Sequence, residues 1–207
     1  MRLQRLLDLL RVHLLAPGVD ALRAPAQDGD HAVHAVRAVR AGAARAPRPP
    51  AWLLAGAMRG EPTLFAGKDF VFPRAGRDCA ADVYQQAGIT DPRREIDAAE
   101  IYVPFSWYEP MWPENLGFAA PGEGWKLTES GATALDGDLP VNMSGGVLST
   151  NPIGASGVIR FVEAALQVRG QAGEHQVDGA RTVLGHAYGG GSQFFSMWLV
   201  GSEPPDS

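Results

Sequence analysis

The chain has 207 residues, of which 45% are hydrophobic and 20% charged, and its formal net charge is -5. This composition is typical of one globular domain with a real core and excludes a disordered chain. No apolar run approaches the roughly 18 residues that a membrane helix needs, and the leucine-rich Met1–Leu15 lacks the unbroken apolar core of a signal peptide.

The charge is distributed unevenly along the chain. Residues 1–50 hold 8 arginines against 4 aspartates, a net charge of +4, whereas residues 51–207 hold 10 Lys and Arg against 19 Asp and Glu, a net charge of -9. An acidic main body argues against nucleic acid as a partner, because phosphate binding needs clustered Lys and Arg. With Cys79 as the single cysteine there is no internal disulfide, which fits the reducing cytoplasm, where we expect the protein to act.

Residues 1–50 show no clear sequence pattern of a folded domain. Residues 31–41 form a three-residue near-repeat and residues 45–50 an Ala/Arg/Pro linker, and neither matches the helical or the strand period. Two interpretations stay open. The segment is a helical N-terminal extension, or it is the corrupted 5′ end of a truncated longer gene, because GC-rich DNA read in a wrong frame gives this bias. Neither interpretation gives His31 or His34 a catalytic role.

From residue 51 onward the pattern is orderly, and we expect one domain over residues 51–207. Ala51–Met58 is an apolar run of strand length. Arg77–Ala87 has helical spacing, and Gly88 follows it where a C-cap glycine is expected. Ile96–Phe105 predicts a strand, and Ser106–Leu116 predicts a helix that two prolines interrupt.

The C-terminal part contains the strongest helix prediction, Gly157–Arg169, which Gly170 ends. One face of this helix is apolar and consists of Val158, Ile159, Val162, Ala165 and Leu166. Thr182–Ala187 and Gln193–Val200 then predict two strands joined through a triple glycine. Strands that alternate with helices indicate an α/β layered domain.

Two glycine-rich tracts stand out, at residues 142–157 and 186–191. Glycine has no Cβ, so it permits positive φ and lets a ligand or another backbone approach closely. One amphipathic helix and one strand-like run separate the tracts. This arrangement indicates backbone loops that converge on a single site.

The two tracts together resemble the C-terminal half of the thiolase superfamily, in which they form the acyl-CoA reaction centre. Ile96–Phe105 is similar to the thiolase strand that ends in Asn-Glu-Ala-Phe, or in His-Asp-Cys-Phe in the sterol-carrier-protein-X-like branch, and matching on Phe105 puts Tyr102 at the Asn or His position. Residues 116–142 also resemble that branch. The resemblance covers roughly residues 50–202 and implies a layered thiolase-like C-terminal domain, a mixed sheet with helices. The thiolase N-terminal half, which supplies the nucleophilic cysteine, is not recognisable.

The departures from the thiolase pattern change the expected chemistry. Thiolases carry Gly-His-Pro where this chain has Thr150-Asn151-Pro152, and they carry Cys-x-Gly-Gly-Gly where this chain has Ala187-Tyr188-Gly-Gly-Gly. The remaining cysteine, Cys79, lies in a predicted helix with no adjacent base. Condensation by the usual thiolase route, which needs a cysteine nucleophile, is therefore not expected.

Tyr102, Tyr188 and Asn151 remain at the site, and this pattern resembles the lipid-transfer-protein aldolases, which cleave the side chain of steroid acyl-CoA thioesters. The resemblance implies retro-aldol cleavage of a β-hydroxyacyl-CoA to a ketone and a shorter acyl-CoA. This step needs a base for the hydroxyl proton, donors for the thioester enolate and an acid for the carbanion. It implies Tyr188, Tyr102 and Asn151 as the catalytic residues. The expected substrate-binding residues are Gly145, Gly146, Gly189, Gly190 and His186.

Each of these residues has a structural alternative. Buried tyrosines commonly pack the ring and satisfy the hydroxyl. Tyr108 is a weaker candidate, because its proline-flanked helix could be a packing or lid element. His186 is expected to share a face with Tyr188 only if the strand continues past it, and burial is its main alternative role. Asn151 either donates to the thioester oxygen or braces the loop before Pro152.

The sequence leaves two alternatives to the aldolase hypothesis. One is a thiolase or acetyl-CoA acyltransferase of the lipid-transfer-protein kind, and the other is a non-catalytic fragment or structural subunit. The resemblance implies a homodimer and, in the aldolase branch, a small OB-fold partner protein. We expect no cofactor beyond coenzyme A as part of the substrate. We also expect no metal, because the five histidines show no ligand spacing.

Overall fold

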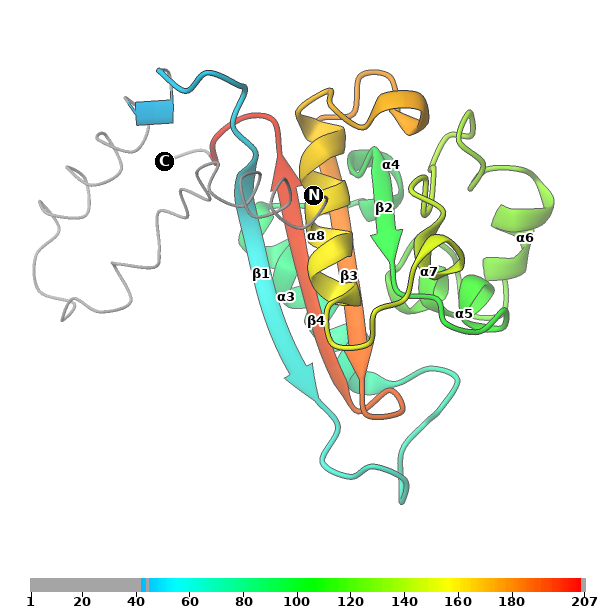
Figure 1. Ribbon diagram of the computed structural model, residues 1–207. Coiled ribbons are helices and arrows are strands. Elements are labelled where there is room, and N and C mark those ends of the chain that lie inside the picture. The colour runs from blue at the N-terminus through cyan, green and yellow to red at the C-terminus, as the bar shows by residue number, and fades with distance from the viewer. Residues whose placement is uncertain (1–41, 44, 206–207) are drawn as a thin grey trace, which may run out of the picture.

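The computed structural model describes residues 42–43 and 45–205 (Figure 1). The predictions for residues 1–41, including His31 and His34, lie outside these residues. The strands of the sheet are β1 (Trp52–Gly60), β2 (Ala98–Ile101), β3 (Thr182–Gly189) and β4 (Phe194–Gly201), in the order β1-β4-β3-β2. β4 pairs antiparallel with β1 and β3, whereas β2 pairs parallel with β3. The mixed sheet confirms the predicted α/β class.

Helices cover both faces of this sheet (Figure 1). α3 (Arg74–Ala87) packs on β1 and β4, and α8 (Ser156–Val168) packs on the opposite face against β3, β2 and β4. Each helix closes its own apolar core against the sheet. The connections hold the short helices α4 (Pro92–Glu95), α5 (Tyr108–Asn115), α6 (Gly124–Glu129) and α7 (Gly146–Ser149), and the 3-10 turn η1 (Gly173–His175). None of the described helices is long and apolar enough to cross a membrane.

The predicted strand Ile96–Phe105 is shorter than expected, because β2 ends at Ile101. The next residue, Tyr102, still donates its backbone N–H to the His186 carbonyl at 3.2 Å. Beyond it, Pro104 has no N–H to continue a ladder. The chain therefore leaves the sheet directly after Tyr102, and α5 begins six residues later at Tyr108.

The apolar face predicted for α8 is not the face that the helix buries. The buried stripe consists of Ser156, Arg160, Ala164, Gln167 and Val168, whereas Val158 is 51% exposed. Polar side chains occupy the inner stripe because they find partners there. Arg160 meets Glu100 of β2 at 3.3 Å, and Gln167 donates to the His175 carbonyl at 2.7 Å. Hydrophobic periodicity alone could not reveal this, since it cannot see partners on another element.

The C-terminal end of α3 confirms the predicted glycine cap. Gly88 has a φ of 70°, its N–H bonds back to the Gln85 carbonyl, and the Ile89 N–H bonds to the Tyr84 carbonyl. This is the left-handed termination that glycine favours. No atom lies within 4 Å of the position that a Cβ at Gly88 would occupy. Any cost of a side chain here therefore comes from the backbone conformation.

We expect Gly88→Ala to lower the free energy of unfolding by about 1 kcal/mol, because an L-residue disfavours the left-handed region. Gly88→Asn should lower the free energy of unfolding by a smaller amount, since asparagine tolerates this conformation better. Urea unfolding of the unchanged protein and the two variants measures the order of their stabilities. Equal midpoints for Gly88→Ala and the unchanged protein would contradict the expectation.

Candidate functional site

The two candidate tyrosines lie at the same end of neighbouring parallel strands. Ile101 of β2 is in register with His186 of β3. Tyr102 directly follows Ile101 and Tyr188 lies two residues after His186, so both tyrosines are at this end of the paired strands. Their ring centroids are 5.3 Å apart in an edge-to-face arrangement. Strand pairing thus brings together two side chains that are far apart in the sequence.

β3 continues through Tyr188 to Gly189, so His186 and Tyr188 share one face of the strand. The His186 ring is fully buried, 5.2 Å from the Trp112 ring and 6.1 Å from the Phe195 ring. Neither ring nitrogen has a hydrogen-bond partner among the described residues. Burial lowers the pKa of His186 to about 3, so the ring stays neutral in the folded protein. His186 is therefore a buried, neutral ring beside Tyr188, with 6.2 Å between the two ring centroids.

This burial predicts a pH dependence of stability. In the unfolded chain His186 takes up a proton below its ordinary pKa of about 6.5, whereas the folded protein takes it up only near pH 3. The contribution of His186 to stability is therefore present above pH 6.5 and is lost as the pH falls from 6.5 toward 3, by up to about 1.4 kcal/mol per pH unit.

His186→Leu should remove this dependence while leaving stability at pH 7 unchanged or higher. The measurement is the difference in urea midpoint between the two proteins from pH 7.5 to pH 4. A difference that stays constant over this range would contradict the burial argument.

Trp112 of α5 is the centre of an aromatic cluster that the sequence did not predict. Its ring is fully buried and lies 4.8 Å from the Tyr108 ring, in a stacked arrangement, and 5.0 Å from the Tyr188 ring. Its Nε1 donates to the Tyr102 carbonyl at 3.0 Å. Trp112 thus contacts both candidate tyrosines. The only signal in the sequence was the i,i+4 spacing of two aromatic residues on one predicted helix.

The Tyr188 hydroxyl lies in surroundings that keep it protonated. Tyr188 is half-buried, and burial raises its pKa well above the ordinary value, helped by the neighbouring Tyr108 and Tyr102 hydroxyls. Tyr108 is only 5.1 Å away between ring centroids, and its own hydroxyl lies 3.4 Å from Ser192 Oγ. A neutral tyrosine is a proton donor rather than a base.

Asn151 is braced through its oxygen and keeps its amide hydrogens free. Asn151 Oδ1 accepts hydrogen bonds from Tyr102 Oη at 3.3 Å and from Ser156 Oγ at 2.7 Å. Among the described residues none accepts a hydrogen bond from Asn151 Nδ2, and the side chain is exposed. The geometry therefore allows both roles that the sequence left open, bracing and donation.

The two glycine tracts form tight turns beside these residues. Gly145 and Gly146 have φ values of 83° and 55° and begin α7, and Gly190 and Gly191 both have a φ of 60° in the β3–β4 hairpin. Gly189, the last residue of β3, is exposed, as are Gly145 and Gly190. At the start of α8 a Cβ on Gly157 would lie 3.1 Å from Ala187 Cβ. The first tract thus ends against the residue that precedes Tyr188.

Cys79 lies outside this site. It is fully buried in α3, its Sγ donates to the Ala57 carbonyl at 3.3 Å, and burial is the main cause that raises the pKa of its thiol to about 11. Such a thiol is no nucleophile at neutral pH. Over residues 42–43 and 45–205, no group of three or more His, Cys, Asp or Glu side chains could hold a metal ion.

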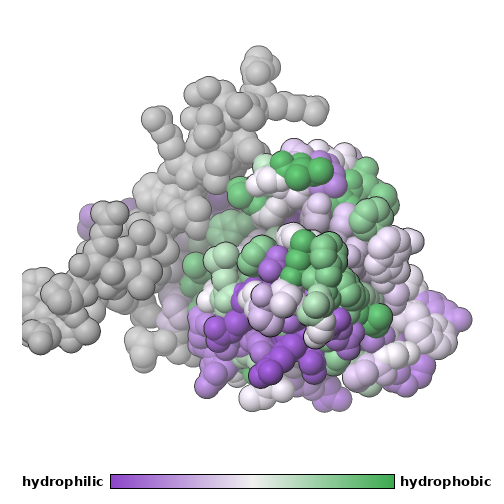
Figure 2. Space-filling model, turned by 90° about the horizontal axis from the view of Figure 1, so that it is seen from below, coloured by the Kyte–Doolittle hydropathy of each residue, from purple (hydrophilic) through white to green (hydrophobic). Residues whose placement is uncertain are grey.

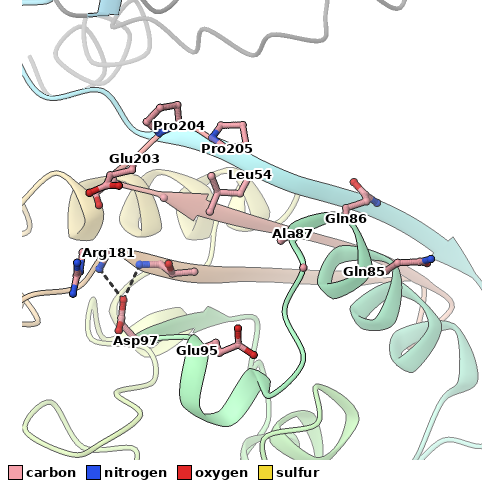
Figure 3. A pocket seen from close by; sticks show the side chains of 14 residues that line it. Leu54, Gln85, Gln86, Ala87, Glu95, Asp97, Arg181, Glu203, Pro204 and Pro205 are labelled. Atoms are coloured by element: carbon pink, nitrogen blue, oxygen red, sulfur yellow. Dashed lines mark hydrogen bonds between the residues drawn. The ribbon is translucent and has the colours of Figure 1, made fainter. Parts of the chain in front are cut away.

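A cavity of about 790 Å³ lies at the opposite end of the sheet (Figure 3). Asp97, which precedes β2, lies at this cavity, and its Oδ2 accepts hydrogen bonds from the backbone N–H groups of Arg181 and Thr182 at 2.8 Å each. Its carboxylate therefore holds the start of β3. Because Asp97 precedes β2 and Tyr102 follows it, this cavity is separate from the tyrosine site.

Three comparisons place the chain among known proteins. Residues 56–201 match the family "Thiolase C-terminal domain-like". The chain is 36% identical over 143 residues to an acetyl-CoA acetyltransferase of Methanothermobacter thermautotrophicus and 34% identical over 146 residues to sterol carrier protein 2 of Bos taurus, with 68% of this chain covered in each case. It is also similar to the solved Ltp2-ChsH2(DUF35) aldolase, with a TM-score of 0.67, 26% identity and 76% of this chain covered.

The family match covers most of the chain, so the chain belongs to the thiolase C-terminal domain-like family. This confirms the resemblance and the fold that the sequence predicted. The chain spans 37% of the length of the archaeal protein, 26% of the bovine protein and 41% of the aldolase chain.

Proposed function

We propose that this member of the thiolase C-terminal domain-like family acts on acyl-CoA thioesters and cleaves the C–C bond of a β-hydroxyacyl-CoA by a retro-aldol step. The observation that carries the proposal is the neutral Tyr188 hydroxyl beside Tyr102, at a site where no cysteine nucleophile is present among residues 45–205. A retro-aldol step needs proton transfer but no covalent intermediate. The similarity to an aldolase of known structure supports the same reaction class.

The proposed step moves one proton from oxygen to carbon. Both tyrosines start as neutral hydroxyls and act as a proton relay. Tyr102 takes the proton of the β-hydroxyl while it gives its own proton to Tyr188, whose ring is 5.3 Å away between centroids, and Tyr188 gives its own proton to the α-carbon. The bond between the α- and β-carbons breaks, the β-carbon becomes the ketone carbonyl, and the protonated α-carbon belongs to the shorter acyl-CoA. Each tyrosine ends with one proton, so the site is restored without net proton uptake.

Asn151 is the proposed donor to the thioester oxygen. Its Nδ2 is free among the described residues, and its oxygen is fixed by Tyr102 and Ser156. A donor already held in place stabilises the negative charge that develops on the enolate oxygen. We propose that five residues shape the surroundings of the thioester, namely Gly145, Gly146, Gly189, Gly190 and the buried His186.

Exposed aromatic side chains beside the tyrosines favour an apolar acyl group such as a steroid. Phe105 and Trp107 lie before α5, stack at 4.8 Å between centroids, and are both more than half exposed. Trp107 is 5.4 Å from Tyr108, which continues the cluster inward. A flat apolar surface next to the reacting groups suits a polycyclic substrate better than a short acyl chain.

We further propose that residues 51–207 form the C-terminal part of a two-part site and that the protein acts as a homodimer or with a small OB-fold protein. The similar aldolase structure is described as a complex with a DUF35 protein. Several large apolar side chains are exposed, above all Leu148 at 97% and Ile153 at 90%. Figure 2 shows further apolar surface on the face of the domain seen from below in Figure 1. Such surface suits contact with another chain.

Acyl transfer is the second candidate, because the chain is similar to an acetyl-CoA acetyltransferase. It needs a nucleophile from outside the described residues, since Cys79 is buried and protonated. A non-catalytic role as a structural subunit is the third candidate, and the exposed apolar side chains favour it.

The testing experiment is a cleavage assay with a steroid β-hydroxyacyl-CoA, run with and without a DUF35 protein and read by mass spectrometry. Equal amounts of ketone and shorter acyl-CoA are the expected products. The corresponding β-ketoacyl-CoA is assayed in parallel with free CoA, because thiolysis needs a β-keto group. Thiolysis of this second substrate, without any cleavage of the β-hydroxyacyl-CoA, would replace the aldolase proposal with acyl transfer. No product from either substrate would leave the structural-subunit hypothesis.

A further inference from the structure

A buried ion pair lies beneath the first glycine tract. Glu100 of β2 is fully buried and Arg160 of α8 is 1% exposed, and Arg160 Nη1 lies 3.3 Å from Glu100 Oε2. Neither residue was singled out by the sequence, and among the described residues no hydrogen bond or ion pair joins either of them to the candidate tyrosines. A buried ion pair generally stabilises a fold no more than a well-packed apolar pair of similar size. Stability alone therefore does not explain this pair.

The carboxylate of Glu100 holds the loop at residues 142–146. Glu100 Oε1 accepts the Ser144 backbone N–H at 3.0 Å, and Glu100 Oε2 accepts the Ser144 hydroxyl at 2.9 Å. Ser144 Oγ in turn accepts the Gly146 N–H at 3.3 Å. Burial raises the pKa of Glu100, and the Ser144 hydrogen bonds and Arg160 oppose this rise. One carboxylate thus fixes a loop in which Asn142, Gly145 and Gly146 have positive φ.

The same loop is joined to β2 by a second residue. Asn142 has a φ of 56°. Its backbone N–H donates a hydrogen bond to the Ala99 carbonyl at 2.9 Å, and its Oδ1 accepts a hydrogen bond from the Ile101 N–H at 2.8 Å. A Cβ on Gly146 would lie 3.4 Å from Arg160 Nη1, so the guanidinium lies directly under this glycine. The loop therefore sits on β2 and on the Arg160 side chain.

Three segments that carry candidate site residues meet at Glu100. Tyr102 follows Glu100 by two residues, Gly145 and Gly146 belong to the loop that Glu100 holds, and Arg160 is one helical turn after Ser156, which binds Asn151. A change at this point moves all three segments relative to one another. Misplacing reacting groups by about 1 Å can cost about a hundredfold in rate.

We propose that Glu100 is a positioning residue that holds the 142–146 loop in its active arrangement through Ser144, with Arg160 as the counter-charge that anchors α8 to the same point. The activity part of this inference rests on the proposed function. Two double variants separate the hydrogen bonds to Ser144 from the buried charges. Glu100→Gln with Arg160→Met removes both charges but keeps a side chain that can bond to Ser144. Glu100→Met with Arg160→Met removes both charges and these hydrogen bonds.

The experiment compares the two double variants by urea unfolding, by hydrogen exchange of residues 142–150, and by turnover of the β-hydroxyacyl-CoA. The Gln-containing variant should keep the exchange protection and turnover within about threefold, whereas the Met-containing variant should lose about a hundredfold in kcat with a smaller change in KM. Glu163→Gln, on the same helix, is the control and should leave turnover unchanged. Its carboxylate pairs with the partly exposed His175 at 3.2 Å.

Hydrogen exchange keeps the inference testable if the unchanged protein shows no cleavage. In that case the proposed function fails, and loss of loop protection in the Met-containing variant alone still supports the role of Glu100. Equal protection and equal turnover in the two double variants would overturn it. So would a loss of turnover that follows the urea midpoint in every variant, because that pattern describes a purely structural pair.

Discussion

Tyr188→Phe should abolish C–C cleavage while leaving the fold and CoA-ester binding intact. The variant removes the hydroxyl whose raised pKa keeps it protonated, and it retains the ring that packs against Tyr102 and Trp112. Loss of a general acid lowers the rate by about 10²–10⁴-fold. The measurement is kcat with a β-hydroxyacyl-CoA, together with the dissociation constant of an unreactive CoA thioester.

Tyr84→Phe is the matched control for this change. Tyr84 is a tyrosine of α3 whose hydroxyl donates to the Leu116 carbonyl at 2.7 Å, outside the aromatic cluster of the site. Its loss should lower the free energy of unfolding by about 1 kcal/mol and leave turnover unchanged. If Tyr188→Phe retains full turnover, the acid role proposed for Tyr188 is wrong. If both variants lose turnover equally, the effect is one of folding.

Trp112→Ala should destabilise the domain more than any other single change considered for this chain. The ring is fully buried and contacts Tyr108, Tyr188, His186 and Phe195. Deleting a buried tryptophan costs about 3–5 kcal/mol, a large share of the 5–15 kcal/mol that stabilises an ordinary domain. The removed indole also leaves the Tyr102 carbonyl without its 3.0 Å hydrogen bond. The measurement is urea unfolding followed by near-ultraviolet circular dichroism.

Trp112→Phe separates packing from the hydrogen bond. It keeps most of the aromatic contact and loses the indole N–H, so the free energy of unfolding should fall by less than in Trp112→Ala. Turnover should still decrease, because the residue after β2 is held less firmly. A loss of under about 1 kcal/mol in Trp112→Ala would show that the cluster relaxes into the cavity and does not support the site.

The sequence predicted most of the elements because their signals are local. The helical spacing of residues 77–87 and the glycine after it gave α3 and its cap, and the two apolar runs around the triple glycine gave β3 and β4. The replacements at Asn151 and Ala187 are equally visible in the sequence, and together with the position of Cys79 they make the usual thiolase chemistry unexpected. Periodicity and motif spacing were sufficient for these conclusions.

The tertiary structure decided which side chains meet. The register of β2 with β3 brings Tyr102 to Tyr188, and α5 places Trp112 against the Tyr188 ring and the Tyr102 carbonyl. The inner face of α8 can carry Arg160 because Glu100 of β2 pairs with it there. The residue pattern of one helix cannot reveal a partner on another element. The sequence by itself thus determined the family, most of the elements and the replacement of the thiolase histidine and cysteine by Asn151 and Ala187. Only packing between segments distant along the chain decided the burial of Tyr188 and His186, and with it which protonation states the site can hold.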